Sequence, residues 1–445
     1  MEEKLDFKRV LPIFIIVLVE MLGLTIIIPL LPLYAGSFGA NEVVIGMLAA
    51  AFPLMQLIGS PILGGLSDRY GRKPVLLFSQ FGTLAGFLLL GIANTLPLLF
   101  LARIIDGLSG GNIVAAQAAI TDSTTEKTRA QGLGLIGAAF GLGFTIGPAI
   151  AGISLVLTNN NYHVPAFIAA GFSILSIILT YTWLKETLPE ERRGEHAQKR
   201  GLQYLSNMKY AISYPMIGTL LILIFMQQVV FYGFENLMSI FTLSRLGLNA
   251  AGNTVLFVFI GIIIIMVQGK YIGPWSRRFG ERKLIIGGLA MLAFGLMIIS
   301  VAPSQTVPWY NREEMIQELN QENHRQSNPI NIELTIPDDD NSGLLGIGWM
   351  LLAMIPTTIG ASVLMPSINS LITQQVTQKE TGSVLGVSSA LVSLANALAP
   401  IIGGILFLAS GTTLPFLLGG IVLAGLSAFA LNTLGTQAEP QHNTI

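Results

Sequence analysis

Twelve long apolar stretches limit what this chain can fold into. Each has about 20 residues or more, enough for a helix that crosses the roughly 30 Å hydrocarbon core of a bilayer. Only 11% of the residues are charged, against about 25% in soluble domains. Backbone groups in lipid must bond within the segment, which favours helices. We predict an all-α membrane protein with twelve transmembrane helices, over residues 10–33, 43–66, 75–94, 97–121, 131–157, 164–184, 212–241, 252–273, 284–302, 344–372, 381–409 and 412–432.

Lysine and arginine residues gather in alternate connections between these stretches. If the N-terminus lies inside the cell, 20 of the 24 Lys and Arg residues fall on the cytoplasmic side, as the positive-inside rule requires. The segments concerned are 1–9, 67–74, 122–130, 185–211, 270–283 and 373–380. We expect a multi-pass protein of the cell membrane (the inner or plasma membrane), with both termini in the cytoplasm.

The two halves of the sequence resemble each other. Residues after the second and eighth stretches match at an offset of 209, and residues around the fifth and eleventh match at 252. The pairs include Ser67 with Ser276, Gly71 with Gly280, Pro148 with Pro400 and Gly152 with Gly404. The alternative is chance similarity among glycine-rich helices. We predict two six-helix halves, over 1–186 and 212–433, joined by a cytoplasmic linker over 187–211 and followed by a cytoplasmic tail over 434–445.

A polar insertion over 304–343 accounts for the change of offset. We predict that it lies on the outer side and contains a short amphipathic helix over 311–320. The insertion has eight acidic and two basic residues. An acidic mouth would concentrate cations, and the alternative is a solvated, variable loop.

Several segments resemble the major facilitator superfamily. Gly64 to Lys73 has every fixed position of that family's G-x-L-x-D-R-x-G-R-K signature, and Arg103 with Gly107 resembles its R-x-x-x-G pattern. The segment 143–152 is similar to the antiporter motif G-x-x-x-G-P-x-x-G-G, with Ala151 in place of one glycine. The first helix, around Glu20, is similar to that of tetracycline-type and multidrug proton antiporters.

The resemblance implies a fold of two pseudo-symmetric six-helix halves and secondary active transport by alternating access. We expect a non-enzymatic, proton-coupled antiporter that exports amphipathic small molecules (drug efflux, hence antibiotic resistance). Its partners would be the substrate, protons and the lipid bilayer, and the chain would be a monomer. A nutrient symporter or facilitator and a lipid or glycolipid flippase are alternatives on the same scaffold.

No organic cofactor is expected, because the proton gradient supplies the energy. No Walker-type ATP loop occurs in the sequence, which argues against ATP drive. Four His and no Cys leave little material for a metal site, and a net charge of -1 gives no basic field for nucleic acid. We therefore predict neither a metal site nor nucleic-acid binding.

Three ionisable residues inside the predicted helices are candidates for proton coupling: Glu20, near the middle of the bilayer, and Arg103 and Asp106, nearer the outer face. A charge at this depth is expensive and needs a partner or a function. Asp106 follows Arg103 by three residues, so the two share a helix face. A carboxylate beside a permanent cation would let proton and substrate compete. The alternatives are structural, namely an acid satisfied by neighbours and a static pair within one helix.

Polar residues in other helices are candidates for the substrate cavity. Seven residues separate Gln228 from Glu235, which places both on one face of the seventh helix. Glu235 could instead be solvated at the membrane interface. The predicted cavity residues are Gln117, Gln227, Gln228, Glu235, Asn369 and Asn396.

Residues of the signature loop and the acid that ends the fourth helix are candidates for conformational gating. The resemblance implies that Asp68 docks against a helix of the other half and that Arg72 pairs with Asp122. Such a charge cluster would shift the balance between the inward-open and outward-open states. The alternative is that the basic residues only fix the orientation of the chain in the membrane. The predicted gating set is Asp68, Arg69, Gly71, Arg72 and Asp122.

The antiporter-like motif comprises Gly143, Gly147, Pro148 and Gly152. Its small residues let helices approach closely, and Pro148 removes a backbone hydrogen bond and can bend the helix. The motif predicts a tight, pliable seam, and ordinary helix packing is the alternative.

Overall fold

The computed structural model describes residues 6–125, 128–193, 215–320, 335–338, 340–376 and 378–434. Within them, 12 helices are long and apolar enough to cross a membrane, which confirms the predicted fold class. The first six spans are α1 (Phe7–Ile27) with α2 (Leu31–Gly36), α3 (Glu42–Tyr70), α4 (Arg72–Gly91), α5 (Leu96–Ser109) with α6 (Asn112–Asp122), α7 (Arg129–Leu157) and α8 (His163–Thr182). The last six are α10 (Pro215–Leu246), α11 (Ala250–Met266) with α12 (Ile272–Phe279), α13 (Glu281–Ser300), α15 (Leu345–Gln374), α16 (Gln378–Ser410) and α17 (Thr413–Leu434).

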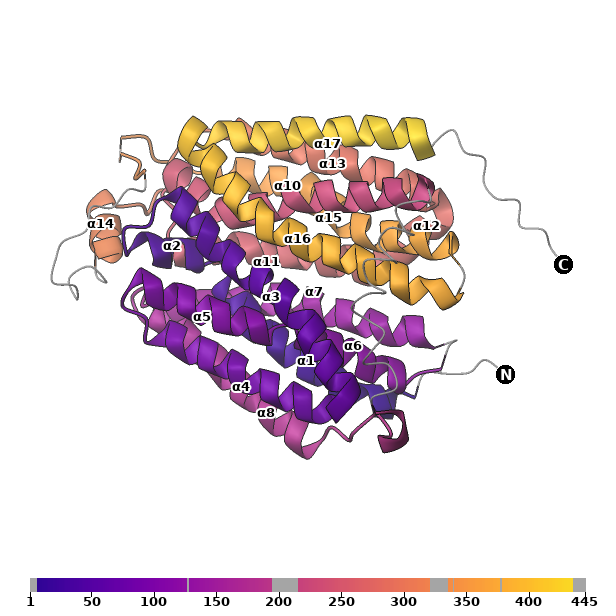
Figure 1. Cartoon of the computed structure of the whole chain (residues 1–445). Helices are drawn as coiled ribbons and strands as arrows, with labels where there is room; N and C mark the ends of the chain where they lie inside the picture. The colour runs from indigo at the N-terminus through magenta and orange to yellow at the C-terminus, as the bar shows by residue number, and fades with distance from the viewer. Residues whose placement is uncertain are drawn as a thin grey trace.

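The spans form two bundles that lie side by side, α1 to α8 in one and α10 to α17 in the other (Figure 1). Helix α1 begins and helix α17 ends at the same end of the molecule, here named the terminal end. The short helix expected in the insertion is α14 (Arg312–Asn320). It lies at the opposite end, named the insertion end.

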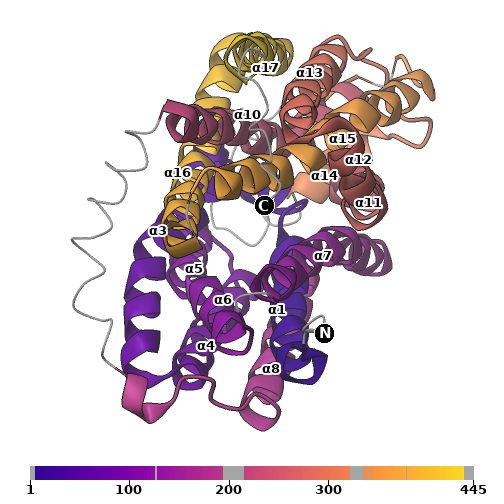
Figure 2. The ribbon, with the colours of Figure 1, turned by 90° about the vertical axis from the view of Figure 1, so that its right-hand side faces the viewer.

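Two pairs of helices join the bundles: α3 packs against α16, and α7 packs against α11 (Figure 2). Both seams depend on glycine. A Cβ atom at Gly46 would overlap the carbonyl oxygen of Pro400, and one at Gly152 would overlap the hydroxyl of Thr254. Because glycine has no side chain, the helix backbones can approach closely at these points. The contacts lie toward the insertion end, which is closed.

The same seam helices diverge toward the terminal end. A Cβ atom at Gly134 or Gly137 in α7, or at Gly386 in α16, would meet no described atom within 4 Å. The two ends of the molecule therefore differ. The halves are joined at the insertion end and separate from each other at the terminal end.

Three predicted spans are not single regular helices, so the expectation over 10–33, 97–121 and 252–273 was too simple. The first span breaks after α1, beside Pro29, which has no backbone N–H to donate. The fourth breaks at Gly110 and Gly111 between α5 and α6. The eighth contains a π-helical turn over Val267–Tyr271, a feature that often marks functional sites.

The predicted loops over 67–74 and 270–283 are largely helical, which corrects a second expectation. Only Gly71 separates α3 from α4, and only Gly280 separates α12 from α13. Their φ angles are 103° and 77°, a region that glycine enters without steric cost. The two glycines are the residues paired by the offset of 209, so the sequence repeat is also a repeat of backbone conformation.

Candidate functional site

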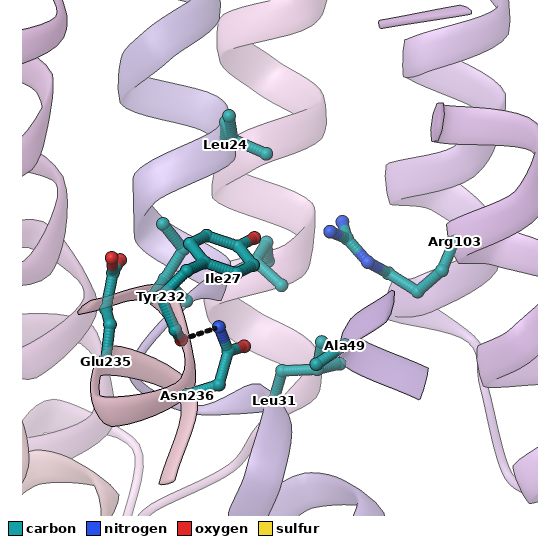
Figure 3. A pocket seen from close by; sticks show the side chains of 9 residues that line it. Leu24, Ile27, Leu31, Ala49, Arg103, Tyr232, Glu235 and Asn236 are labelled. Carbon is teal, nitrogen blue, oxygen red and sulfur yellow. Dashed lines mark hydrogen bonds between the residues drawn. The ribbon is translucent and has the colours of Figure 1, made fainter. Parts of the chain in front are cut away.

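A pocket lies between the two bundles, and side chains of both line it (Figure 3). The C-terminal half contributes Tyr232, Glu235 and Asn236 from α10, and the N-terminal half contributes Arg103 from α5. In this view the Tyr232 ring lies between Glu235 and Arg103. The remaining lining is aliphatic, formed by Leu24, Ile27, Ile28, Leu31 and Ala49. Two of the predicted residues, Arg103 and Glu235, therefore reach one pocket from opposite halves.

Arg103 and Asp106 form a buried ion pair on α5. The Arg103 Nη1 atom lies 2.9 Å from Asp106 Oδ2, and the side chains are only 7% and 4% exposed. The guanidinium also lies over the Phe52 ring, 4.5 Å from its centroid, in cation–π contact. A Cβ atom at Gly107 would crowd the backbone of Phe52. Gly107 thus lets α5 approach α3 closely enough for this contact.

Glu20 lies in a separate polar cluster inside the N-terminal half. The Asn112 amide donates to both carboxylate oxygens, at 3.1 and 3.2 Å, and the Ser176 hydroxyl lies 3.4 Å from Oε1. Gln80 extends the cluster by donating to Ser176 and to Thr180, each at 2.8 Å. These polar partners were not among the predicted site residues. The one available signal was an asparagine directly after Gly110-Gly111 within an apolar span.

Glu235 differs from the other interior acids. Its Oε1 atom is buried, and within the described part of the chain it has no hydrogen-bond partner. The Gln227 Oε1 atom shares this condition. Leaving a buried polar atom unbonded costs about 1–3 kcal/mol, so such an atom is suited to accept a ligand. The polar side chains of α10 thus offer unused acceptors.

The remaining predicted cavity residues fall into pairs or lie apart. The Gln228 Nε2 atom donates to Asn396 Oδ1 at 2.8 Å, which joins α10 to α16. Asn369 accepts from the Ser388 hydroxyl at 3.3 Å. Gln117 is exposed on α6, and a different α6 residue, Asn112, contacts the interior acid. None of these four lines the pocket in Figure 3.

Comparison with known proteins assigns the family. The family model of the Major Facilitator Superfamily matches residues 13–311 and 342–444. The chain belongs to the Major Facilitator Superfamily. It is 27% identical to the tetracycline resistance protein, class B, of Escherichia coli, over 94% of this chain and 92% of that protein. It is 26% identical to multidrug resistance protein 1 of Bacillus subtilis (strain 168), over 87% of each chain.

Solved transporter structures share the fold. The human organic anion transporter MFSD10 (TETRAN) superposes with a TM-score of 0.68 at 20% identity, covering 96% of this chain and all of that one. The nucleoside transporter NupG superposes with a TM-score of 0.66 at 12% identity, covering 97% of this chain and all of that one. At these identities the likeness establishes the fold alone.

The superfamily signature forms a charge cluster at the terminal end. Arg72 Nη1 lies 2.6 Å from Asp68 Oδ1, and Arg72 Nε lies 2.9 Å from Asp122 Oδ2. The predicted pair with Asp122 is therefore present. These two contacts lie within the N-terminal half, and the implied docking of Asp68 against the other half stays a prediction. Arg69 lies over the ring of its neighbour Tyr70.

Glu186 completes this cluster, although it was not among the predicted site residues. Its carboxylate accepts from the backbone N–H groups of Arg72 and Lys73, at 2.9 and 3.2 Å. These are the first N–H groups of α4, which have no partner within the helix. A Cβ atom at Gly71 would clash with this carboxylate. Both the φ angle and the contact therefore require glycine at position 71.

The antiporter-like motif of this superfamily member serves two contacts. Gly143 and Gly147 pack against Met21 and Thr25 of α1, and the Thr25 hydroxyl donates to the Gly143 carbonyl at 2.8 Å. Gly152 instead faces α11 of the other half. Pro148 lies inside α7 between these contacts. The motif thus connects packing within the N-terminal half to the seam between the halves.

Proposed function

We propose that this transporter exports amphipathic small molecules across the cell membrane in exchange for protons, with its terminal end in the cytoplasm. Relatives named for tetracycline and multidrug resistance, which align over about nine-tenths of the chain, support export of drug-like compounds. The distribution of Lys and Arg supports the orientation. The closed insertion end and separated terminal end correspond to a state that loads cargo from the cytoplasm.

The chemistry of the central pocket carries this proposal. Its aliphatic wall suits an apolar body, and the carboxyl of Glu235 and the cation of Arg103 suit polar substituents. Arg103 is already paired with Asp106, whereas Glu235 Oε1 has no described partner. A few placed polar groups in an apolar cavity are typical of small-molecule sites. We assign Glu235 to cargo binding.

Glu20 and Asp106 are assigned to proton coupling. An arginine in a protein does not lose its proton, so Arg103 competes with a proton for Asp106. Proton arrival at Asp106 would weaken this pair and free Arg103 to interact with other groups in the pocket. Glu20, held by amide and hydroxyl donors instead of a cation, is the second proton carrier. The proton gradient is the only energy source in this scheme, with no organic cofactor.

The test uses inside-out membrane vesicles with an acidic lumen and two probes, tetracycline and ethidium. We expect probe accumulation and matching proton release from the lumen, both abolished when the pH gradient is collapsed. The Glu20→Gln and Asp106→Asn variants should lose accumulation, whereas a control at an exposed acid, Glu190→Gln, should retain it.

Three outcomes would contradict the proposal. Accumulation that survives in both variants removes the proton role of the two acids. Probe equilibration without accumulation indicates a facilitator. Movement of a fluorescent lipid, but of neither probe, indicates a flippase.

A further inference from the structure

The insertion is anchored to the C-terminal half before it reaches α14. The Val307 N–H donates to the Leu246 carbonyl at 2.9 Å, and the Tyr310 ring lies directly on Gly247. The Asn311 side chain then accepts from the N–H groups of Glu313 and Glu314, which caps the start of α14. These contacts hold α14 at the end of α10. The last turn of α14 can still contact the other half.

Besides packing against α2, α14 is hydrogen-bonded to the N-terminal half through one carboxylate in its last turn. Glu318 Oε2 accepts from the Asn160 amide at 2.8 Å, and Oε1 accepts from the Tyr162 hydroxyl at 3.2 Å. Both donors lie between α7 and α8. Glu318 Oε2 also accepts from the Asn249 amide at 3.1 Å, just before α11 of the C-terminal half. Glu318 therefore joins both halves at the closed end, beside the fully buried Leu319.

The donors on both sides are held in place by contacts that do not involve Glu318. Asn249 Oδ1 accepts from the Gly252 N–H at 2.9 Å, capping α11 and aiming its amide nitrogen outward. Asn160 has a φ angle of 58°, a left-handed conformation that asparagine tolerates better than most residues. Tyr162 packs on Tyr34 of α2, with ring centroids 5.3 Å apart. The site is thus built from rigid parts of both halves.

We propose that α14 is a latch, and that Glu318 holds the insertion end closed by fastening the α7–α8 connection to the start of α11. Alternating access requires the halves to part at this end, which must break the contacts of Glu318 with Asn160 and Tyr162. The latch does not depend on which cargo is carried.

The latch is sensitive to pH because burial raises the pKa of Glu318 above its usual range, although the three donors oppose this. Opening exposes the carboxyl and returns its pKa toward normal. The closed state therefore holds the proton more tightly, so acid favours closure and rising pH favours opening. The titratable groups nearby are Tyr162, the adjoining His163, Tyr34 on α2 and Glu314 one turn earlier on α14.

The test is a distance measurement in lipid nanodiscs. The chain has no native cysteine, so spin labels can be placed by Leu157→Cys and Leu344→Cys, two sites 78% and 62% exposed at the insertion end of opposite halves. In Glu318→Ala we expect the ratio of closed to open molecules to fall about tenfold, as for the loss of two ordinary hydrogen bonds. Asn160→Gly keeps the backbone conformation, removes one donor and should shift the same ratio by less.

Glu318→Gln keeps an acceptor for the two asparagines and cannot ionise. It should remain closed as pH rises from 5 to 8, whereas the wild type opens. Glu313→Gln, at an exposed acid on the same helix, is the control and should behave as the wild type. Unchanged distances in both Glu318→Ala and Asn160→Gly would overturn the latch. A pH response that persists in Glu318→Gln would assign the titration to His163 or another group and overturn the role of Glu318 as the sensor.

Discussion

The two halves of this transporter share a backbone plan but differ in where they place charge. Gly71 and Gly280 form equivalent turns, and Asn41 and Asn249 cap equivalent helices. The interior acids of the N-terminal half have polar or cationic partners, whereas in the C-terminal half Glu235 presents a buried oxygen without a described one. The two halves thus repeat the parts that bend and pack. In the proposed function, proton coupling rests on acids of the N-terminal half, and cargo binding draws on Glu235 of the C-terminal half.

Breaking the ion pair of the N-terminal half should have the largest effect. Asp106→Asn leaves Arg103 buried without a counter-charge, which should lower the free energy of unfolding by about 3 kcal/mol and abolish proton-driven export. Thermal unfolding in detergent and vesicle transport measure the two effects. The double variant Arg103→Met with Asp106→Leu should recover most of the stability but none of the export. A stable, active Asp106→Asn protein would show that the pair is dispensable.

Adding a methyl group at a glycine of either seam should have the same effect on closure of the insertion end. Gly152→Ala and Gly404→Ala each place a Cβ atom against the facing helix, at Thr254 and at Glu42. Overpacking costs about 1–3 kcal/mol, so the closed insertion end should be depopulated roughly tenfold. The distance between spin labels at Leu157→Cys and Leu344→Cys should lengthen and export should fall.

Gly134→Ala is a matched control for the seam variants, since it lies on the same helix as Gly152 but faces open space. It should leave both the spin-label distance and export unchanged. If only one of the two seam variants changed the label distance and export, the two seams would not contribute equally to closing the insertion end.

Neutralising the acid of the C-terminal half should change cargo preference and leave stability intact. Glu235→Gln should weaken the binding of ethidium, a cation, about tenfold, which corresponds to about 1.4 kcal/mol, and weaken an uncharged dye much less. Equilibrium binding to the purified protein measures both. Asn236→Ala, an uncharged pocket change, should not discriminate between the dyes. Equal losses for both dyes would argue against a charge role.

The smallest effect concerns how the equivalent helices α4 and α13 begin. Glu186 caps α4 from the segment after α8, whereas Glu281 lies at the start of α13 and accepts from Ser276 and Ser370. Glu186→Ala should lower the free energy of unfolding by about 1 kcal/mol, as for a lost helix cap. Glu186→Gln keeps one acceptor and should cost less, and the exposed Glu190→Ala should cost nothing measurable by thermal unfolding.

The fold could be predicted because its signals are local. Span length, Lys and Arg placement and the paired glycines are all properties of short segments. The helix breaks beside Pro29 and at Gly110 were missed because an apolar stretch shows its length but not its internal hydrogen bonds. The spacing of Arg103 and Asp106 along one helix was sufficient to predict their contact.

Contacts between distant segments could not be predicted in the same way. Gln228 and Asn396 were each proposed for the cavity, but their mutual bond depends on how α10 packs against α16. The same holds for Asn112 with Glu20 and for Glu318 with Asn160. Only the packed structure decides which polar residues face each other across two helices.

The close approach of the helix backbones at Gly46 and Pro400 also matters for the ion gradients across the membrane. A Cβ atom has no room there, and a water molecule, with a radius of about 1.4 Å, needs more space than that. No water molecule can therefore lie between the two helices at this point. Contacts of this kind are what an idle carrier needs in order to stay in the membrane without short-circuiting the ion gradients on which its host depends.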